Sequence, residues 1–302
     1  GLFYKSRFMS SLIQFQLIHF HRRLSNLLYH NISHRSIINC HPFTPHFSTK
    51  FTTSFRSSSL LTMNSTESDL WTGVDEEQKK LMNEEVILVD RNDQILGGLS
   101  KKESHLISNQ LPLHRAFSVL LFNTKHQMLL QQRASTKITF PSYWTNTCCS
   151  HPLFSIDQET DGILGAKKAA IRKLHHELGI DVNCWSNSNE NLNEFVFMNK
   201  VHYKAESDCG IWGEHEIDYV LICVKDVDLN VSKNEVDDVK YLNREELKEL
   251  LEQDGNGIVK VTPWFKYIVN AFVFQWWDQL DSKEVLRDAV DTQHQIHRFG
   301  DV

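Results

Sequence analysis

Long apolar runs and CxxC motifs are both missing from the 302-residue sequence. It has no stretch of about 18 consecutive apolar residues, so we expect no membrane-spanning helix. Its six cysteines are too few for a disulfide-dense secreted protein of this length. No CxxC pair occurs, which leaves a structural zinc finger unsupported. We therefore expect free thiols and a reducing compartment.

Acidic residues are absent from the first 66 positions, which carry seven Lys/Arg. This basic segment, rich in Ser, Thr, His and Phe, is typical of an organelle transit peptide, although a basic tail without a targeting role has the same composition. The chain begins with Gly1, which fits a fragment or an extended reading frame. Met9 and Met63 are candidate starts, and a form starting at Met63 would remain in the cytosol.

The rest of the chain is acidic. Residues 67–302 hold 25 Lys/Arg against 38 Asp/Glu, which makes them a poor candidate for nucleic-acid binding. Because neither repeats nor a low-complexity insert interrupts this part, we expect one domain over residues 67–302, and we expect it to be a monomer.

The pattern of apolar residues predicts strands and helices in alternating groups. Strand–turn–strand patterns predict two hairpins, and an Ala-rich stretch without Pro that ends in Gly179 predicts a helix. The expected helices cover 75–85, 165–179, 244–251 and 263–280, the hairpins 86–98 and 116–132, and further strands 194–204 and 219–224. This order favours an α/β or α+β sandwich, a mixed sheet flanked by helices.

The densest group of reactive side chains lies in residues 141–152, PSYWTNTCCSHP. The stretch has no helix or strand period, so we expect an ordered loop, and such loops are often functional. If its backbone is extended, Cys149 and His151 point to the same side. A thiol beside an imidazole suits acid–base, nucleophilic or metal chemistry, whereas a tightly packed turn with a buried cysteine pair is the structural alternative.

Several further residues are candidates for a metal or anion site. Mixed His and carboxylate ligands suit a divalent ion such as zinc, manganese or magnesium, although any one of sixteen histidines is more often a surface or capping residue. The candidate ligands are His105, His114, His151, Glu214 and Glu216. Glu177 could hold a magnesium ion that bridges to a phosphorylated substrate, or form a surface ion pair instead. Lys101, Arg133 and Lys137 are basic groups that suit a diphosphate or remain solvated.

Three aromatic residues lie in or near the segments that carry these candidates. Trp144, Tyr203 and Trp264 are most simply core residues, but an electron-rich ring could also face a developing carbocation.

Four of these segments together closely resemble type I isopentenyl-diphosphate delta-isomerases, over roughly residues 80–290. They are 114–122 (HRAFSVLLF), 141–152 (PSYWTNTCCSHP), 210–219 (GIWGEHEIDY) and 262–266 (TPWFK). The resemblance implies a Nudix fold, and the basic presequence then suggests a plant-like member addressed to the chloroplast, with the mitochondrion as the alternative.

The Nudix box, Gx5Ex7REUxEExGU, is only partly present when aligned on Gly179. Arg172 and Glu177 match it, but Leu164, Lys173 and His176 stand where the box has glutamates. Nudix hydrolases collect magnesium with those glutamates, so their loss argues against hydrolysis.

The resemblance also implies roles for individual residues. It implies Cys149 and Glu216 as catalytic groups, with Tyr203 beside Glu216, and His105, His114, His151, Glu214 and Glu216 as ligands of one divalent ion (Mg²⁺, Mn²⁺ or Zn²⁺). It implies Glu177 on a diphosphate-bound Mg²⁺, and Lys101, Arg133, Lys137, Ser150 and Trp264 as substrate contacts.

The implied reaction converts isopentenyl diphosphate to dimethylallyl diphosphate by adding a proton at C4 and removing one at C2 through a tertiary cation. Which group protonates first stays open. A Nudix hydrolase acting on nucleoside diphosphates and an inactive metal-binding module are the two rival interpretations.

Overall fold

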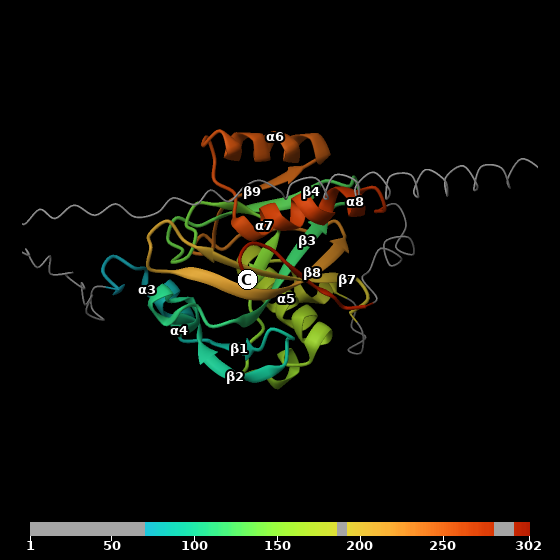
Figure 1. Cartoon of the computed structure of the whole chain (residues 1–302). Helices are drawn as coiled ribbons and strands as arrows, with labels where there is room; N and C mark the ends of the chain where they lie inside the picture. The colour runs from blue at the N-terminus through green and yellow to red at the C-terminus, as the bar shows by residue number, and fades with distance from the viewer. Residues whose placement is uncertain (1–69, 186–191, 281–292) are drawn as a thin grey trace, which may run out of the picture. The chain divides into compact units, whose positions relative to one another are not determined.

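The computed structural model describes residues 70–185, 192–280 and 293–302 (Figure 1). The chain divides after Thr62, and the described residues all belong to the unit Met63–Val302. The predicted transit peptide over residues 1–66 and the alternative start at Met63 lie outside the described residues. No helix within the described ranges is long and apolar enough to cross a membrane.

The second unit combines one extensive sheet with helices. The helices are α3 (Glu76–Leu81), α4 (Lys101–His105), α5 (Gly162–Leu178), α6 (Arg244–Gly255), α7 (Pro263–Ile268) and α8 (Phe274–Trp277), with a π-helical turn over Val269–Val273. The strands are β1 (Glu85–Val89), β2 (Ile95–Ser100), β3 (His114–Phe122), β4 (Met128–Arg133), β5 (Trp144–Thr145), β6 (Cys148–Ser150), β7 (Val196–Glu206), β8 (Gly213–Val224), β9 (Val236–Leu242) and β10 (Ile296–Arg298).

The strands form a mixed sheet around β3. Its main path runs β10–β7–β8–β3–β1–β2, and β3 also pairs with β4 and β6 while β9 and β5 pair with β4. The β3–β8 ladder is parallel and aligns His114 with Glu216, whereas β7–β8 is antiparallel and aligns Tyr203 with Glu216. The register therefore brings side chains from three strands to one point.

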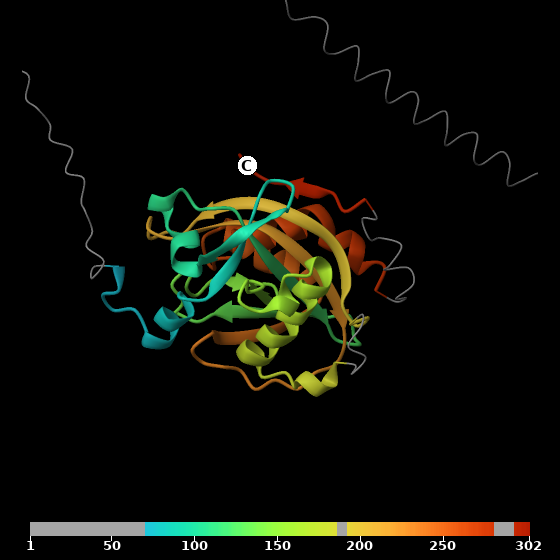
Figure 2. The same ribbon diagram turned by 90° about the horizontal axis from the view of Figure 1, so that it is seen from below.

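Helices cover both faces of this sheet (Figures 1 and 2). On β3, alternation sends Phe117, Val119 and Leu121 into the core beneath α5, and Leu120 and Phe122 into the core beneath α6, α7 and α8. The Ala-rich face of α5 packs closely on the sheet, and Gly179 ends the helix in the left-handed conformation that Gly favours (φ 65°). The predicted sandwich of a mixed sheet flanked by helices is confirmed.

Several predicted elements need correction. The hairpin over 116–132 has its turn, but β3 and β4 share only the pair Phe122–Met128, because β4 pairs along its length with β9 instead. The predicted helix 75–85 ends at Leu81, because Glu85 already begins β1. The helix predicted over 263–280 is interrupted by the π-helical turn and ends at Trp277.

Strand structure is also more extensive than predicted. The segment 141–152 is not wholly a loop, because β5 and β6 form within it and pair with β4 and β3. Strand β8 begins at Gly213, six residues before the predicted strand at Tyr219, because its polar first half lines the site described below and so lacks an apolar pattern. The helix α4, which carries the first candidate metal ligand, lies in what the sequence predicts to be a polar connection.

Candidate functional site

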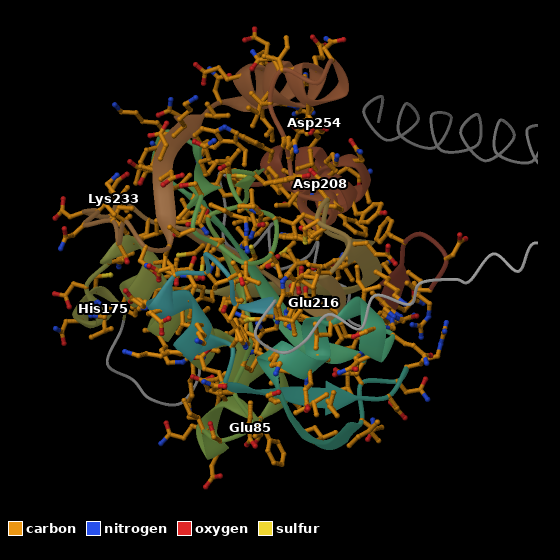
Figure 3. The ribbon with its side chains drawn as sticks, turned by 90° about the vertical axis from the view of Figure 1, so that its left-hand side faces the viewer. Glu85, His175, Asp208, Glu216, Lys233 and Asp254 are labelled. Carbon is orange, nitrogen blue, oxygen red and sulfur yellow. The ribbon has the colours of Figure 1, made fainter. Side chains whose placement is uncertain are left out.

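The five predicted metal ligands lie together in the interior. One potential ligand atom from each of these residues lies within 4.8 Å of the others, and all five residues are buried: His105, His114, His151, Glu214 and Glu216. The three imidazole rings surround one point, with ring centroids 4.7–5.0 Å apart. Figure 3 shows Glu216 inside the body of the protein, whereas Lys233 and His175 lie at its periphery.

Separate elements bring these ligands together. His105 ends α4, which is capped by Ser100, and His114 begins β3. Glu214 and Glu216 lie two residues apart on β8, so that alternation turns both carboxylates to the same face of the sheet. Since His114 is the register partner of Glu216, the parallel β3–β8 ladder sets this part of the cluster.

The donor set suits a divalent cation. Nδ1 of His105 lies 2.7 Å from the Lys101 carbonyl oxygen, and Nδ1 of His114 lies 2.8 Å from that of Pro112, so each N–H donates outward and leaves Nε2 with a lone pair. Nε2 of His105 and Oε2 of Glu214 lie 2.6 Å apart, but with the His105 proton on Nδ1 both atoms are acceptors. These two atoms and Nε2 of His114 are buried without a satisfactory hydrogen bond in the described part of the chain. A buried polar atom without a partner costs folding free energy, and one cation would be a partner for all three atoms.

The electrostatics of the cluster agree with that assignment. Burial lowers the pKa of His105 and His151, so both remain neutral, which is the metal-binding form. Burial alone would raise the pKa of the two glutamates, but the neighbouring imidazoles hold the pKa of both Glu214 and Glu216 below its ordinary value. The carboxylate of Glu216, in contrast, raises the pKa of His114 despite its burial. The cluster therefore offers imidazole nitrogens and anionic oxygens as ligands, as zinc, manganese and magnesium sites do in differing proportions.

The two adjacent cysteines are separated by the sheet. Cys148 faces the core beneath α5, whereas Cys149 packs against the core on the opposite face and lines the pocket. Burial raises the pKa of Cys149 to about 12, even though the nearby Arg133 guanidinium acts to lower it. At neutral pH Cys149 is therefore a protonated thiol that can donate a proton rather than a thiolate nucleophile.

Glu216 has a second polar neighbour in Tyr203. The Tyr203 hydroxyl donates a hydrogen bond to Oε2 of Glu216, and Nε2 of His151 lies 2.7 Å from Oε1. Burial and the carboxylate raise the pKa of Tyr203 well above its ordinary value, so the phenol stays protonated. Glu216 is consequently a buried, ionised carboxylate within the metal-binding cluster that can accept a proton.

Most of the predicted site residues line one pocket, which opens to solvent. Its lining consists of Lys101, Arg133, Lys137, Thr139, Cys149, Ser150, His151, Glu177, Tyr203, Glu214, Glu216 and Trp264. The lining combines basic side chains with a thiol, carboxylates and aromatic rings, and Arg133 lies close to both the Cys149 thiol and the Trp264 ring. A ligand with an anionic group and an apolar part suits such a mixed lining.

The aromatic wall is formed by stacked rings. Tyr203 and Trp264 stack with centroids 5.9 Å apart, and Phe140 meets Trp264 edge-on at 5.1 Å. Trp144 is not among the lining residues, contrary to the interpretation that it could face a cation: it is buried in the core, with Nζ of Lys240 4.4 Å from its ring centroid. Its place in β5 turns it away from the pocket lining.

The altered Nudix box has a clear structural counterpart. Nζ of Lys173, at a position where the box has glutamate, lies 3.2 Å from Oε1 of Glu177, and Oε2 of Glu177 accepts a hydrogen bond from Gln131. An ammonium group thus takes the place of a carboxylate that a hydrolase would use for metal binding. Glu177 keeps a lowered pKa because the charge of Lys173 outweighs the effect of burial.

Sequence reasoning missed Thr139 in the pocket lining and Glu235 behind it. Thr139 uses its carbonyl and hydroxyl oxygens to accept hydrogen bonds from Arg133, and Glu235 forms an ion pair with Lys137. Nothing in the spacing of either residue indicates the pocket. The position of Glu235, which directly precedes β9, depends on the β4–β9 pairing, which the sequence does not show.

Comparison with known proteins gives a consistent result. Residues 112–265 match the NUDIX domain family. The chain is 52% identical over 217 residues to a protein of Gibberella zeae named isopentenyl-diphosphate delta-isomerase. The matched region covers 70% of this chain and 82% of the relative. A protein of the same name from Mesocricetus auratus is 48% identical, covering 75% and 96%, and one from Cannabis sativa named as chloroplastic is 47% identical, covering 75% and 79%.

Proposed function

The chain belongs to the isopentenyl-diphosphate delta-isomerase family within the Nudix superfamily, and on this premise we propose that its pocket moves the double bond of isopentenyl diphosphate to give dimethylallyl diphosphate. The observation that carries this proposal is a protonated thiol and a buried carboxylate lining one pocket with basic side chains. An alkene is a weak base, so its isomerisation needs a buried acid on one side and a base on the other.

Cys149 and Glu216 are the two proton-transfer groups. One adds a proton to C4 of the substrate, and the other removes a proton from C2, so that the double bond moves from C3–C4 to C2–C3. Tyr203 holds one oxygen of Glu216 through its hydroxyl and thereby orients the other oxygen. A divalent ion bound by the five-residue cluster would make Glu216 more acidic, and Mg²⁺ held by Glu177 would neutralise charge on the diphosphate. The five residues of the cluster suit the divalent ion, and the carboxylate of Glu177 is available as a ligand for Mg²⁺.

Trp264 shields the tertiary cation and stabilises it through its ring face. Trp264→Leu should lower kcat about thirtyfold, which corresponds to a desolvated cation–π contact of about 2 kcal/mol, with little change in KM. Trp264→Phe should retain most of the activity because it keeps an aromatic face. Steady-state kinetics check this, with Trp144→Phe as the matched control, since Trp144 is buried in the same core but does not line the pocket. A Leu variant with unchanged kcat would contradict the role.

Lys101, Arg133, Lys137 and Ser150 bind the diphosphate. Burial and the neighbouring lysine lower the pKa of Lys101 to about 8. Lys101 is therefore charged below that pH and neutral above it. We expect kcat/KM to fall about tenfold between pH 7 and pH 9 as one charged contact is lost. In Lys101→Arg this fall should be absent because guanidinium stays protonated. An identical alkaline fall in both proteins would show that another group is responsible.

A single assay in heavy water tests the activity. Isopentenyl diphosphate incubated with the full chain and Mg²⁺ should yield dimethylallyl diphosphate with one deuterium in the new methyl group and no released phosphate, as followed by NMR. A Nudix hydrolase would release phosphate from a nucleoside diphosphate instead, and an inactive binding module would produce neither change.

The subcellular location and the oligomeric state of the protein form part of the same proposal. The acid-free segment over residues 1–66 would direct the chain to the chloroplast, in keeping with the chloroplastic relative from Cannabis sativa. Residues 67–302 would act as one monomeric isomerase domain whose partner is the small diphosphate. A fluorescent fusion to residues 1–66 that stays in the cytosol of plant cells would refute the targeting.

A further inference from the structure

Glu235 is a buried carboxylate just outside the pocket, with no assigned role in the proposed reaction. It is only 2% exposed and directly precedes β9. Its Oε2 lies 2.6 Å from Nζ of Lys137 and 3.9 Å from Nζ of Lys173, while its Oε1 accepts a hydrogen bond of 2.8 Å from Gln78 on α3. Lys137, in contrast, lines the pocket, so this ion pair joins the pocket wall to the interior.

The charges around this carboxylate explain why it is needed. Lys101, Lys137 and Lys173 bring three ammonium groups to one end of the site, and the charges of Lys137 and Lys173 both act to lower the pKa of Lys101. Glu177 and Glu84 offset part of this charge, and Glu235 is the carboxylate that forms the ion pair with Lys137. Like charges in a buried environment repel strongly, so flexible lysine side chains would move apart unless an anion held them.

The backbone anchors Glu235 where it can do this. Its carbonyl oxygen accepts a hydrogen bond from the amide of Ala134, at the start of the turn that carries Lys137. The side chain of Gln78 holds the carboxylate from the other side, with Gln78 itself 3% exposed. These contacts fix the position of the Glu235 carboxylate, and the Lys137 side chain takes the conformation that pairs with it.

We propose that Glu235 is a positioning residue for diphosphate recognition, which holds the ammonium group of Lys137 at the anionic end of the pocket. This inference rests on the proposed function, because it gives the basic end of the pocket to a diphosphate. Glu235 does not line the pocket, so it acts through Lys137 and leaves the proton-transfer groups unaffected.

Glu235→Gln tests the role, since it keeps the shape and removes the charge. The expected result is an about tenfold weaker binding of inorganic pyrophosphate in the presence of Mg²⁺, measured by calorimetry on the full chain, and a similar rise in KM with kcat within about twofold. In a Lys137→Met background the same substitution should weaken pyrophosphate binding by no more than about twofold, because the group through which it acts is gone.

Asp237→Asn is the matched control. Asp237 lies two residues further along the chain and accepts a hydrogen bond from the amide of Ser135, but it is exposed and outside the pocket lining. It should leave pyrophosphate affinity and KM unchanged. If Glu235→Gln loses its cooperative thermal transition, Glu235→Asp takes its place, with an expected weakening of about threefold because the shorter carboxylate withdraws from Lys137.

Two results would overturn the inference. One is a folded Glu235 variant that binds pyrophosphate as tightly as the parent protein, and the other is an equal effect of Glu235→Gln with and without Lys137. Failure of the parent protein to bind pyrophosphate or to isomerise its substrate would instead refute the proposed function, so the two failures are distinguishable.

Discussion

Cys149→Ser is expected to lower kcat by about three orders of magnitude while the affinity for pyrophosphate stays within about twofold of the parent protein. The reason is chemical rather than structural. The thiol of Cys149 lies in the pocket with a pKa of about 12 and can deliver a proton, whereas a serine hydroxyl of nearly the same shape is a far weaker acid. Steady-state kinetics and calorimetry, carried out on the same preparation, separate the loss of proton transfer from a loss of binding.

Cys148→Ala is the matched control for this substitution. Cys148 is the adjacent residue, but it faces the core beneath α5 and its thiol contacts Glu177 from behind, with Sγ 3.5 Å from Oε2. Its truncation should lower the melting temperature by creating a small cavity and keep kcat within about threefold. Equal losses of kcat in the two variants would show that the cysteine pair is structural, which would remove Cys149 from the mechanism.

Glu216→Gln is expected to have an effect at least as large, with kcat reduced by about three to four orders of magnitude. The amide can neither accept nor release the proton, and it also removes an anionic ligand from the five-residue cluster. Metal content measured by mass spectrometry should therefore fall together with kcat. The measurement of pyrophosphate affinity should show little change, since the basic end of the pocket is intact.

Asp93→Asn is a suitable control because it also neutralises a buried carboxylate. Asp93 forms ion pairs with Arg115 and Lys200 and does not line the pocket. Its substitution should lower stability by about 3 kcal/mol or more, as breaking a buried ion pair does, and leave kcat within about twofold. If Glu216→Gln showed the same pattern as Asp93→Asn, the role of Glu216 would be structural.

The polar pairs along single strands could be predicted from the sequence. Alternation places Glu214 and Glu216 on one face, and it separates Cys148 from Cys149 once β6 is known to be extended. Helix α5 was predicted within three residues at its start and with its terminal Gly179, because its composition and cap are local signals. These features depend only on neighbouring residues.

Features that depend on pairing between distant strands could not be predicted in this way. The alignment of His114 with Glu216 comes from a parallel ladder between segments about 100 residues apart, and no local pattern specifies that register. The same limitation explains why β9 was missed and with it Glu235, and why Trp144 was wrongly considered for the pocket. Where the sequence did indicate the assembled site, it did so through resemblance to a family.

The mixed charges of the altered Nudix box account for the type of chemistry. Lys173 pairs with Glu177 in place of the carboxylate that a hydrolase would use, while the thiol of Cys149 and the carboxylate of Glu216 line the pocket. In the proposed function the pocket binds a diphosphate without the set of glutamates that activates water. The proposed isomerisation depends on two separate proton-transfer groups rather than on one.

The stereochemical course of the reaction tests this dependence most directly. Isopentenyl diphosphate labelled stereospecifically with isotopes at C2 and C4 can be converted in water of a third isotope, and the chirality of the new methyl group and the identity of the lost C2 hydrogen can then be determined. Two groups on opposite sides of the substrate predict that the proton at C4 is added to one face and the proton at C2 is removed from the other. Addition and removal on the same face would mean that a single group performs both steps, and would contradict the assignment of Cys149 and Glu216 as a pair.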